Sequence, residues 1–190
     1  FLISNSDIEH FVNLYKSYFS SNEENLFVVE GENIKKFYLE ENYNNENLNG
    51  TLWKSCMRYH NKNNYMNLYS SNIDSVKMLV LLDNNQKIKG RALLWQNCLD
   101  KDNSQYKVMD RIYTVNDDEY TYHFKKWADD NDFLYKKEQR WNNTLYFESK
   151  GKPIFKEMSV KLKNHSYSRY PYLDTFKFYN VESGTFYNYI

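Results

Sequence analysis

The sequence has little cysteine, proline or glycine. Its 190 residues include only 2 cysteines, 2 prolines and 5 glycines. Two cysteines are too few for the disulfide framework of a small secreted protein. No apolar run approaches the roughly 18 residues that a membrane-spanning helix needs. These absences predict an intracellular, cytoplasmic protein in a reducing environment, without a membrane partner.

The chain also lacks net charge, because 25 basic residues face 25 acidic ones. This balance excludes the overall positive field of a typical duplex-DNA-binding protein. In contrast, 19 tyrosines and 12 phenylalanines supply far more ring surface than a disordered chain carries. We therefore expect residues 1–190 to fold as a single domain.

Asparagine is abundant, with 26 residues. This bias is typical of an AT-rich coding genome, such as that of a virus, and indicates ancestry rather than mechanism. The chain begins at Phe1 without an initiator methionine, so we expect it to start inside a longer product.

The N-terminal part, residues 1–70, is predicted to be largely helical. Apolar residues recur every three or four positions over 8–19, which predicts an amphipathic helix. A short β-type run at 26–29 precedes a second helical pattern at 34–41. The asparagine-rich stretch 42–50 has almost nothing to bury and predicts a surface loop.

Residues 76–190 are predicted to be rich in strands. The apolar runs 76–82 and 88–95, separated by an Asp/Asn turn, predict a β-hairpin. A third strand at 106–115 leads into a helix at about 117–129, whose first turn carries three carboxylates. Further short strands are predicted at 133–135, 145–147, 157–163, 173–179 and 185–189. The predicted class is α+β, a mixed and largely antiparallel sheet with helices packed on it.

The order hairpin, strand, helix, strand over 76–135 resembles the central part of the GNAT acyltransferase fold. The stretch 81–94, LLDNNQKIKGRALL, is similar to the strand-turn-strand of that family. The resemblance covers about a third of the chain and implies a Gly-rich loop that holds the pyrophosphate of acyl-CoA. The matching stretch 115–120 has no glycine and contains Asp117, Asp118 and Glu119, which would repel a pyrophosphate. We therefore expect no cofactor, and an inactive or repurposed relative.

Cys56 is a candidate nucleophile. If residues 53–60 are helical, Cys56 and His60 share a face close to Lys54 and Arg58, and such surroundings lower the pKa of a thiol. The alternative is a half-buried, unreactive cysteine beside a surface histidine.

Asp110 and Arg111 are adjacent charges on a predicted strand, where alternation places them on opposite faces. One of them would then point inward and need a partner, for which Arg91 is a candidate for Asp110. The pair is either architectural or the floor of a pocket. An enzyme built on this chain would use Cys56, Asp110 and Arg111 as catalytic residues, either as a divergent acyltransferase or as a thiol-dependent transferase.

No metal site is predicted. The four histidines lie far apart, and Cys98 has no second cysteine at C-x-x-C spacing. Asp and Glu gather at the two ends of the predicted helix 117–129, where solvated helix ends explain them.

Charge is segregated along the chain. Residues 22–47 contain seven Glu against two Lys, whereas 150–177 contain seven Lys or Arg against two acids. Cations interleaved with tyrosines are typical of proteins that bind single-stranded nucleic acid. In this hypothesis the binding residues are Lys161, Lys163, Arg169 and Tyr167. The alternative is an ordinary solvated sheet face with its aromatic side chains in the core.

Three functions follow from these patterns. The favoured one is a non-enzymatic module, of viral or other AT-rich origin, that binds another protein. It is favoured because the cofactor loop and metal ligands are missing from the sequence, while Tyr, Trp and Arg, which interfaces prefer, are present. The enzyme and the nucleic-acid binder are the two alternatives.

Overall fold

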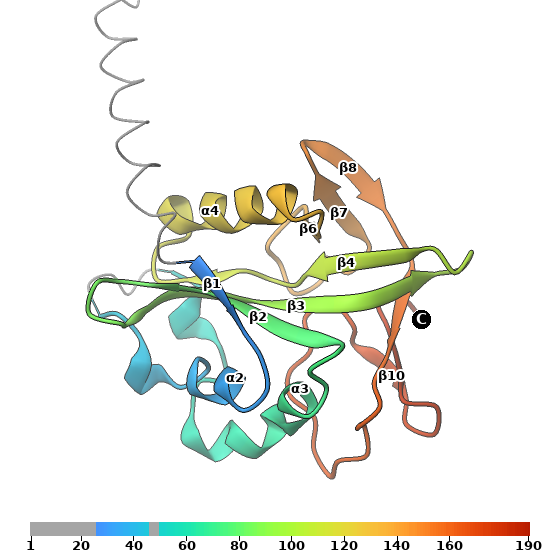
Figure 1. The fold of residues 1–190 in the computed structure, drawn as a ribbon, viewed down its shortest axis with the longest axis horizontal. Coiled ribbons are helices and arrows are strands. Elements are labelled where there is room, and N and C mark those ends of the chain that lie inside the picture. Colours follow the sequence, from blue (N-terminus) through green and yellow to red (C-terminus); the bar gives the residue numbers. More distant parts are fainter. Residues whose placement is uncertain (1–25, 46–49) are drawn as a thin grey trace, which may run out of the picture.

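The computed structural model describes residues 26–45 and 50–190. The helix predicted for residues 8–19 lies outside these residues, as does part of the acidic segment 22–47. The described residues form one curled, mixed sheet of 11 strands with helices on both faces (Figure 1). The predicted α+β class is therefore confirmed.

The centre of the sheet is the antiparallel hairpin of β2 (Val76–Leu82) and β3 (Ile88–Asp100). Both strands are apolar over most of their length because both faces are covered. In the turn, the Asp83 carboxylate accepts the backbone N–H groups of Asn85 and Lys87, each at 2.8 Å. This hairpin and its Asp/Asn turn are as predicted.

The third predicted strand is divided. It consists of β4 (Gln105–Met109) and β5 (Tyr113–Thr114), both paired with β3, with irregular backbone over residues 110–112. The N–H of Ile112 donates to the Gln139 side chain at 2.8 Å instead of to a strand. The interruption matters because it carries Asp110 and Arg111.

Helix α4 (Asp117–Asp130) follows β5 and leads to β6 (Leu134–Lys136), which pairs in parallel with β4. It packs through Phe124 over Gly90 of β3, where a Cβ atom would lie 2.9 Å from the Phe124 ring. At its first turn, Asp117 accepts the backbone N–H of Thr51 at 3.1 Å and the hydroxyls of Thr51 and Thr114 at 2.8 and 2.7 Å. The N-terminal end of the helix is thus occupied by the Asp117 carboxylate and the threonine groups that bind it.

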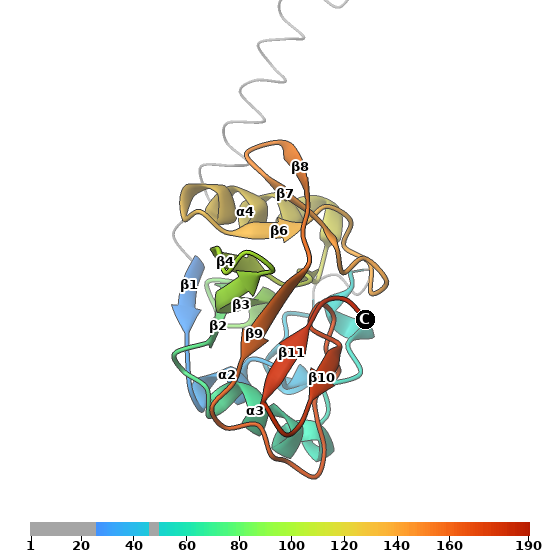
Figure 2. The same cartoon turned by 90° about the vertical axis from the view of Figure 1, so that its right-hand side faces the viewer.

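The C-terminal strands extend the sheet at both ends. The hairpin of β7 (Tyr146–Ser149) and β8 (Lys152–Phe155) follows β6, and β9 (Met158–Lys161) returns to the far end of β3. Strands β10 (Phe178–Asn180) and β11 (Thr185–Tyr187) close this side (Figure 2). Strand β8 was not predicted, and most of the strand predicted at 173–179 is wrong, because residues 173–177 form a loop.

Short helices cover the face of the sheet opposite α4 (Figures 1 and 2). After β1 (Leu26–Val29) come α2 (Asn33–Lys36), the 3-10 turns η2 (Glu40–Asn42), η3 (Leu52–Lys54) and η4 (His60–Met66), and then α3 (Asn67–Ser70). The helix predicted over 34–41 is therefore shorter than expected. One hydrophobic core, which runs from Ile34 to Phe186, joins both layers of helices to the sheet. None of the helices in the described residues is long and apolar enough to cross a membrane.

Candidate functional site

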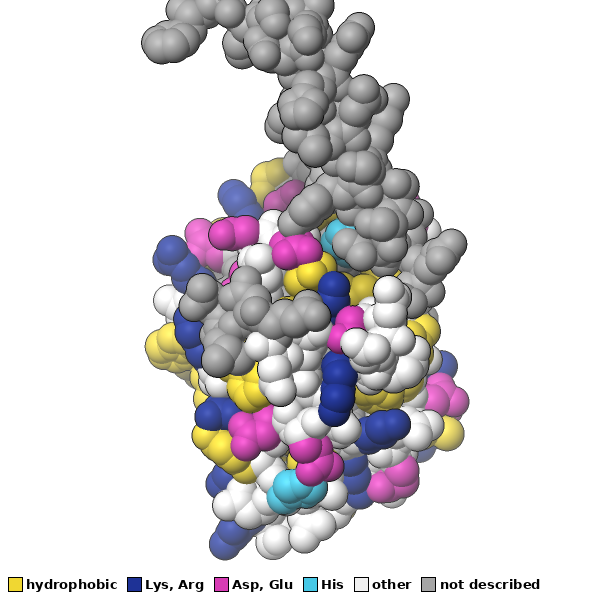
Figure 3. Space-filling view, turned by 90° about the vertical axis from the view of Figure 1, so that its left-hand side faces the viewer, with side chains coloured by type: hydrophobic (Ala, Val, Ile, Leu, Met, Phe, Trp, Pro, Cys, Tyr) yellow, Lys and Arg dark blue, Asp and Glu magenta, His cyan; other side chains and the backbone are white. Residues whose placement is uncertain are grey.

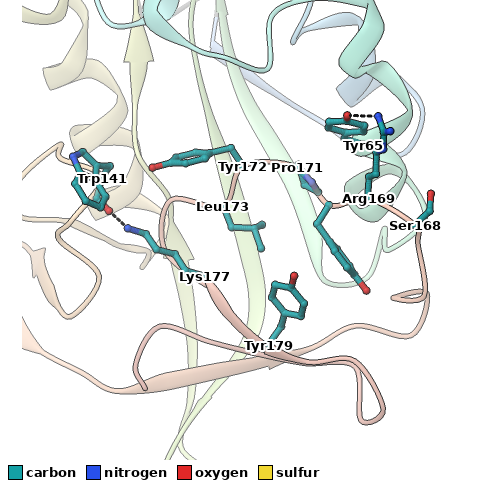
Figure 4. A pocket seen from close by; sticks show the side chains of 10 residues that line it. Tyr65, Trp141, Ser168, Arg169, Pro171, Tyr172, Leu173, Lys177 and Tyr179 are labelled. Atoms are coloured by element: carbon teal, nitrogen blue, oxygen red, sulfur yellow. Dashed lines mark hydrogen bonds between the residues drawn. The ribbon is translucent and has the colours of Figure 1, made fainter.

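An open groove of about 680 Å³ lies between η4, the β6–β7 loop and the C-terminal loops, and we call it the aromatic groove (Figure 4). Five of its lining side chains are aromatic, two are cationic and none is acidic. The lining residues are Tyr65, Trp141, Ser168, Arg169, Tyr170, Pro171, Tyr172, Leu173, Lys177 and Tyr179.

One wall of the groove is held by ring packing. The Tyr170 ring lies 4.8 Å from that of Tyr179 and 6.0 Å from that of Phe186, between centroids. The Tyr170 hydroxyl donates to the backbone carbonyl of His165 at 2.5 Å. These contacts hold the Tyr170 side chain in place, so this wall of the groove is preformed.

Trp141 and Lys177 form one end of the groove. The indole is 59% exposed, in the loop between β6 and β7. The Lys177 ammonium group lies 4.7 Å from the centroid of the Trp141 ring and donates to the Trp141 carbonyl. A large apolar ring is thereby exposed to solvent and kept in place by a cation, and Tyr172 extends toward it (Figure 4).

Arg169 and Tyr65 form the other end. Arg169 Nη1 donates to the Tyr65 hydroxyl at 2.9 Å (Figure 4). This hydrogen bond lowers the pKa of Tyr65. The two cations of the groove therefore lie at opposite ends, each paired with an aromatic side chain rather than with a carboxylate.

A polar cleft adjoins the Arg169 end. Its volume is about 630 Å³, and it shares Tyr65, Ser168 and Arg169 with the aromatic groove. Three asparagines from the η4 segment and the start of α3 also line it: Asn61, Asn64 and Asn67. Their amide groups both donate and accept hydrogen bonds, so the lining of the cleft offers both functions.

A cluster of buried charges lies beside the groove, and we call it the ionic cluster. It consists of Arg91, Asp110, Arg111, Lys136 and Asp174, contributed by β3, the β4–β5 interruption, β6 and the 173–177 loop. Four of the five are less than 9% exposed, and the side chain of Arg111 is 19% exposed. Buried charge is costly unless it is paired, so the partners of each group are informative.

Asp110 has a complete set of partners. Its carboxylate accepts hydrogen bonds from the Thr175 hydroxyl at 2.5 Å, the Arg111 backbone N–H at 2.8 Å and the Trp95 indole at 2.9 Å. These bonds tie three separate segments together. One of the two charges was expected to point inward, and Asp110 does so, but its partner is not Arg91.

Arg91 instead lies between two tyrosine rings. Its guanidinium is 3.8 Å from the centroid of Tyr38 and 4.9 Å from that of Tyr113, and Nη2 donates to the Ser55 hydroxyl at 2.9 Å. The predicted Arg91–Asp110 pair is therefore wrong. Aromatic faces take the place of a carboxylate beside this buried cation, whose Nε has no hydrogen-bond partner.

Asp174 has only one of its two oxygens paired. Oδ2 accepts the Tyr113 hydroxyl at 2.6 Å, whereas Oδ1 has no hydrogen-bond partner and lies 3.7 Å from Nη1 of Arg111. Burial, and then the nearby Asp110, raise the pKa of Asp174. Burial lowers the pKa of Lys136, whose ammonium donates to the Asp174 carbonyl at 3.1 Å.

Arg111 reaches the same cluster as Asp110. Because the strand is interrupted at residues 110–112, the expected alternation to opposite faces does not apply. Nε of Arg111 is buried without a hydrogen-bond partner. The nearest carboxylate is therefore a loose partner, at 3.7 Å, for a guanidinium group.

Cys56 lies in a turn between η3 and η4 rather than in a helix, and it is exposed. The predicted pairing with His60 is not formed, since His60 Nε2 lies 2.6 Å from Glu41 Oε2. Met57 Sδ accepts the backbone N–H of Tyr172 at 3.4 Å, which places this turn beside the groove. Burial, Asp174 and Cys56 raise the pKa of Tyr172. Of the three predicted catalytic residues, Asp110 and Arg111 therefore belong to the ionic cluster, whereas Cys56 lies apart from them in this turn.

The residues predicted to bind nucleic acid do not form one surface. Arg169 lines the aromatic groove, and Tyr167 lines the adjoining cleft. Lys161 is exposed on β9, and Lys163 pairs with Asp74 at 2.8 Å. Neither lysine lines the groove.

The segregated charges are partly compensated in space. The acidic segment binds cations of other elements, and the basic segment binds acids of other elements. The pairs include Glu30–Lys77, Glu40–Arg58, Lys150–Asp132, Lys156–Asp100 and Lys163–Asp74, at 2.7–2.9 Å. On the face seen from the left of Figure 1, basic and acidic side chains are intermixed (Figure 3).

Sequence reasoning did not assign Tyr65, Trp141, Lys136 or Asp174 to a site. Their partners are far away in the sequence, so no periodic pattern joins them. Over residues 26–45 and 50–190, no three His, Cys, Asp or Glu side chains gather in a way that could hold a metal ion.

Comparison with known proteins adds no identification. No protein-family model, curated protein or solved structure matches this chain. The function is therefore argued from the aromatic groove and the ionic cluster.

Proposed function

We propose that this chain is a non-enzymatic binding module whose aromatic groove takes up an extended segment of another protein. The observation that carries the proposal is the groove lining, with five aromatic side chains, two cations and no acid. Trp, Tyr and Arg are the residues that dominate the energy of protein interfaces. Trp141, Tyr172 and Tyr179 are between 45% and 59% exposed, so their rings offer apolar area that a partner would bury.

The groove is also preorganised. Tyr170 is held by two rings and a hydrogen bond, and Trp141 is held by Lys177. Side chains that are already ordered lose little entropy on binding. Preorganisation of this kind supports recognition of a defined segment.

The polar cleft beside the groove supports an extended peptide. A peptide backbone presents N–H and C=O groups that need partners when they leave water. Asn61, Asn64 and Asn67 line the cleft, and an amide side chain can donate to one and accept from the other. A segment that runs from Trp141 past Arg169 would meet aromatic anchors first and amides next.

The small number of cations in the groove favours a protein segment over a single-stranded nucleic acid as its ligand. A nucleic-acid strand carries one phosphate per nucleotide, yet the groove offers only Arg169 and Lys177. Lys163 is paired with Asp74. A strand in the groove would therefore leave most of its phosphates without cations.

The start of α4 supports a module that does not use acyl-CoA. The GNAT-like scaffold is itself a proposal, which rests on the order β2, β3, β4, α4 and parallel β6. In that family the pyrophosphate would lie at the start of this helix. Here the Asp117 carboxylate is present, and Gly50 packs so closely that a Cβ atom would approach the Thr114 carbonyl oxygen to 2.0 Å.

The test is selection of twelve-residue peptides from an unbiased displayed library against the full chain, followed by titration of each selected peptide. We expect Trp141→Ala to weaken binding by about tenfold or more, as loss of a buried aromatic anchor does. Tyr146→Ala is the matched control, because Tyr146 is a 57% exposed aromatic residue outside the groove. If no selected peptide depends on Trp141, the proposal is wrong.

A further inference from the structure

The ionic cluster and its neighbour Lys177 contain more cations than carboxylates. The carboxylates are two, Asp110 and Asp174, whereas the cations are four: Arg91, Arg111, Lys136 and Lys177. Such an excess in a poorly solvated region creates a positive potential, which is stronger there than in water. The chain itself supplies no further carboxylate among the partners of these groups in the described residues.

Two arginines of the cluster, Arg91 and Arg111, each have a buried Nε without a hydrogen-bond partner. Arg111 is the one whose charge also acts on Lys177 of the groove. Asp110 is fully engaged by Thr175, Trp95 and the Arg111 backbone. The Arg111 guanidinium lies 4.9 Å from the centroid of the Tyr113 ring and 3.7 Å from the Asp174 carboxylate, and its Nε is buried without a hydrogen bond. Buried donors are nearly always paired in folded proteins, so the unused donors of Arg111 point to a group that binds there.

Lys177 joins this cluster to the aromatic groove. It lines the groove at the Trp141 end and interacts electrostatically with Arg111, Asp110 and Asp174. Burial, together with the charge of Arg111, lowers the pKa of Lys177 despite the two acids. One of its three N–H donors is used by the Trp141 carbonyl, so two are left for a ligand.

We propose that Lys177, which lines the Trp141 end of the aromatic groove, forms an anion subsite there together with Arg111 of the adjoining ionic cluster, and that this subsite binds the carboxylate of an Asp or Glu side chain in the partner segment. The inference rests on the proposed function, because the carboxylate belongs to the peptide in the groove. A planar guanidinium fork matches a carboxylate in geometry, and the ammonium group adds a point charge. The groove is open and continues into the polar cleft, so the peptide can extend beyond the subsite. The carboxylate therefore belongs to an acidic side chain within the peptide rather than to its C-terminus.

The subsite would fix the register of the bound segment. The apolar rings tolerate many side chains, whereas a pair of half-buried cations favours an anion over other ligands. A partner with an amide in this position would leave the cations unpaired and bind less tightly. The aromatic side chains then supply affinity, and Arg111 with Lys177 supplies specificity.

A double-mutant cycle on a peptide selected as above tests the subsite. Each acidic residue of the peptide is changed to its amide, and binding is measured to the wild-type chain and to Lys177→Gln, whose side chain can still donate to the Trp141 carbonyl. For one acidic position we expect about tenfold weaker binding to the wild type, but less than about a twofold change with Lys177→Gln. Arg169→Gln, which removes the cation at the opposite end, is the control and should keep the tenfold difference.

Equal losses in the wild type and in Lys177→Gln at every acidic position would overturn the subsite, as would selected peptides that contain no acid. Either result leaves the proposed function intact as long as Trp141→Ala still weakens binding. A phosphoserine at the acidic position that binds at least about tenfold tighter than Glu would assign the subsite to phosphate and overturn the carboxylate.

The subsite has a second test that needs no selected peptide. Glutarate, a small dicarboxylate, is titrated into the full chain while the Trp141 indole N–H is followed by NMR. We expect a saturable shift at millimolar concentrations in the wild type and none in Lys177→Gln. Absence of a saturable shift in the wild type would overturn the subsite whether or not a peptide is found.

Discussion

At the scale of single residues, Asp110 shows how one buried carboxylate organises several segments. It accepts donors from β3, from its own chain neighbour and from the 173–177 loop. That loop continues to Lys177, so Asp110 helps to hold the loop that ends at the Trp141 end of the aromatic groove. The sequence predicted that one of Asp110 and Arg111 points inward, but not which one. The partners of Asp110 could not be predicted, because Trp95 and Thr175 lie 15 and 65 residues away.

Asp174 makes the stability of the fold depend on pH. Burial raises the pKa of Asp174 above its value in the unfolded chain, so the folded state holds a proton that the unfolded state releases. The stability contributed by this protonation is complete below the unfolded pKa, near 4, and is lost as the pH rises through the folded pKa. Asp174→Asn removes the charge and keeps an acceptor for Tyr113.

We therefore expect Asp174→Asn to become more stable relative to the wild type as the pH rises from about 4 toward neutrality. Each unit of pKa difference corresponds to about 1.4 kcal/mol. Urea unfolding at several pH values measures the difference, with Asp102→Asn as the control, since Asp102 is an exposed carboxylate of the β3–β4 turn. A difference that is constant or falls with pH would contradict the assignment.

The residues of the groove were only partly predictable. The basic and aromatic character of the C-terminal segment indicated a binding surface, and Arg169 does line the groove. Trp141 pairs with Lys177 across 36 residues, and Tyr65 pairs with Arg169 across 104. Contacts at such separations leave no periodic signal in a single sequence, so Trp141 and Tyr65 were not predicted as groove residues.

At the scale of elements, local patterns were sufficient where the interactions are local. The β2–β3 hairpin follows from two apolar runs and an Asp/Asn turn, and α4 follows from its acidic first turn and helical periodicity. The prediction of one continuous strand over 106–115 was wrong, because the N–H of Ile112 donates to the distant Gln139 side chain and the strand is interrupted there. Residues 173–177 look like a strand, but tertiary contacts of Asp174 and Thr175 hold them in a loop.

The packing of α4 on β3 depends on Gly90. Its backbone does not have a positive φ, so glycine is required here by space alone. A Cβ atom would lie 2.9 Å from both the Phe124 ring and the Thr114 methyl group. We expect Gly90→Ala to destabilise the fold by about 1–3 kcal/mol in urea unfolding, as overpacking of a core does.

A second substitution tests whether the helix is the cause. Phe124→Leu removes ring atoms that would clash, so the double variant should be less destabilised than the sum of the two single variants, by at least about 0.5 kcal/mol. Strictly additive losses would show that the new methyl group does not press on Phe124.

At the scale of the whole molecule, the net charge is zero, and several ion pairs join acidic and basic side chains of segments that are distant in the sequence. The acidic and basic segments, which looked like opposed surfaces in the sequence, bind partners from other elements. Composition could not reveal this, because ion pairs between distant segments depend on the fold. The consequence is a surface without a broad positive field, on which a ligand is recognised at short range in the groove.

Salt dependence distinguishes a protein ligand from a nucleic-acid ligand. A single-stranded nucleic acid that contacts Z cations loses affinity with a slope of about −0.7Z in log K against log salt. We expect the selected peptide to show a shallow slope and, in Lys161→Glu/Lys163→Glu, an affinity within about twofold of the wild type, because neither lysine lines the groove. Loss of the Lys163–Asp74 pair should change stability little, because both side chains are exposed to solvent. Tight, steeply salt-dependent binding of a thymidine dodecamer that this double variant abolishes would instead favour the nucleic-acid hypothesis.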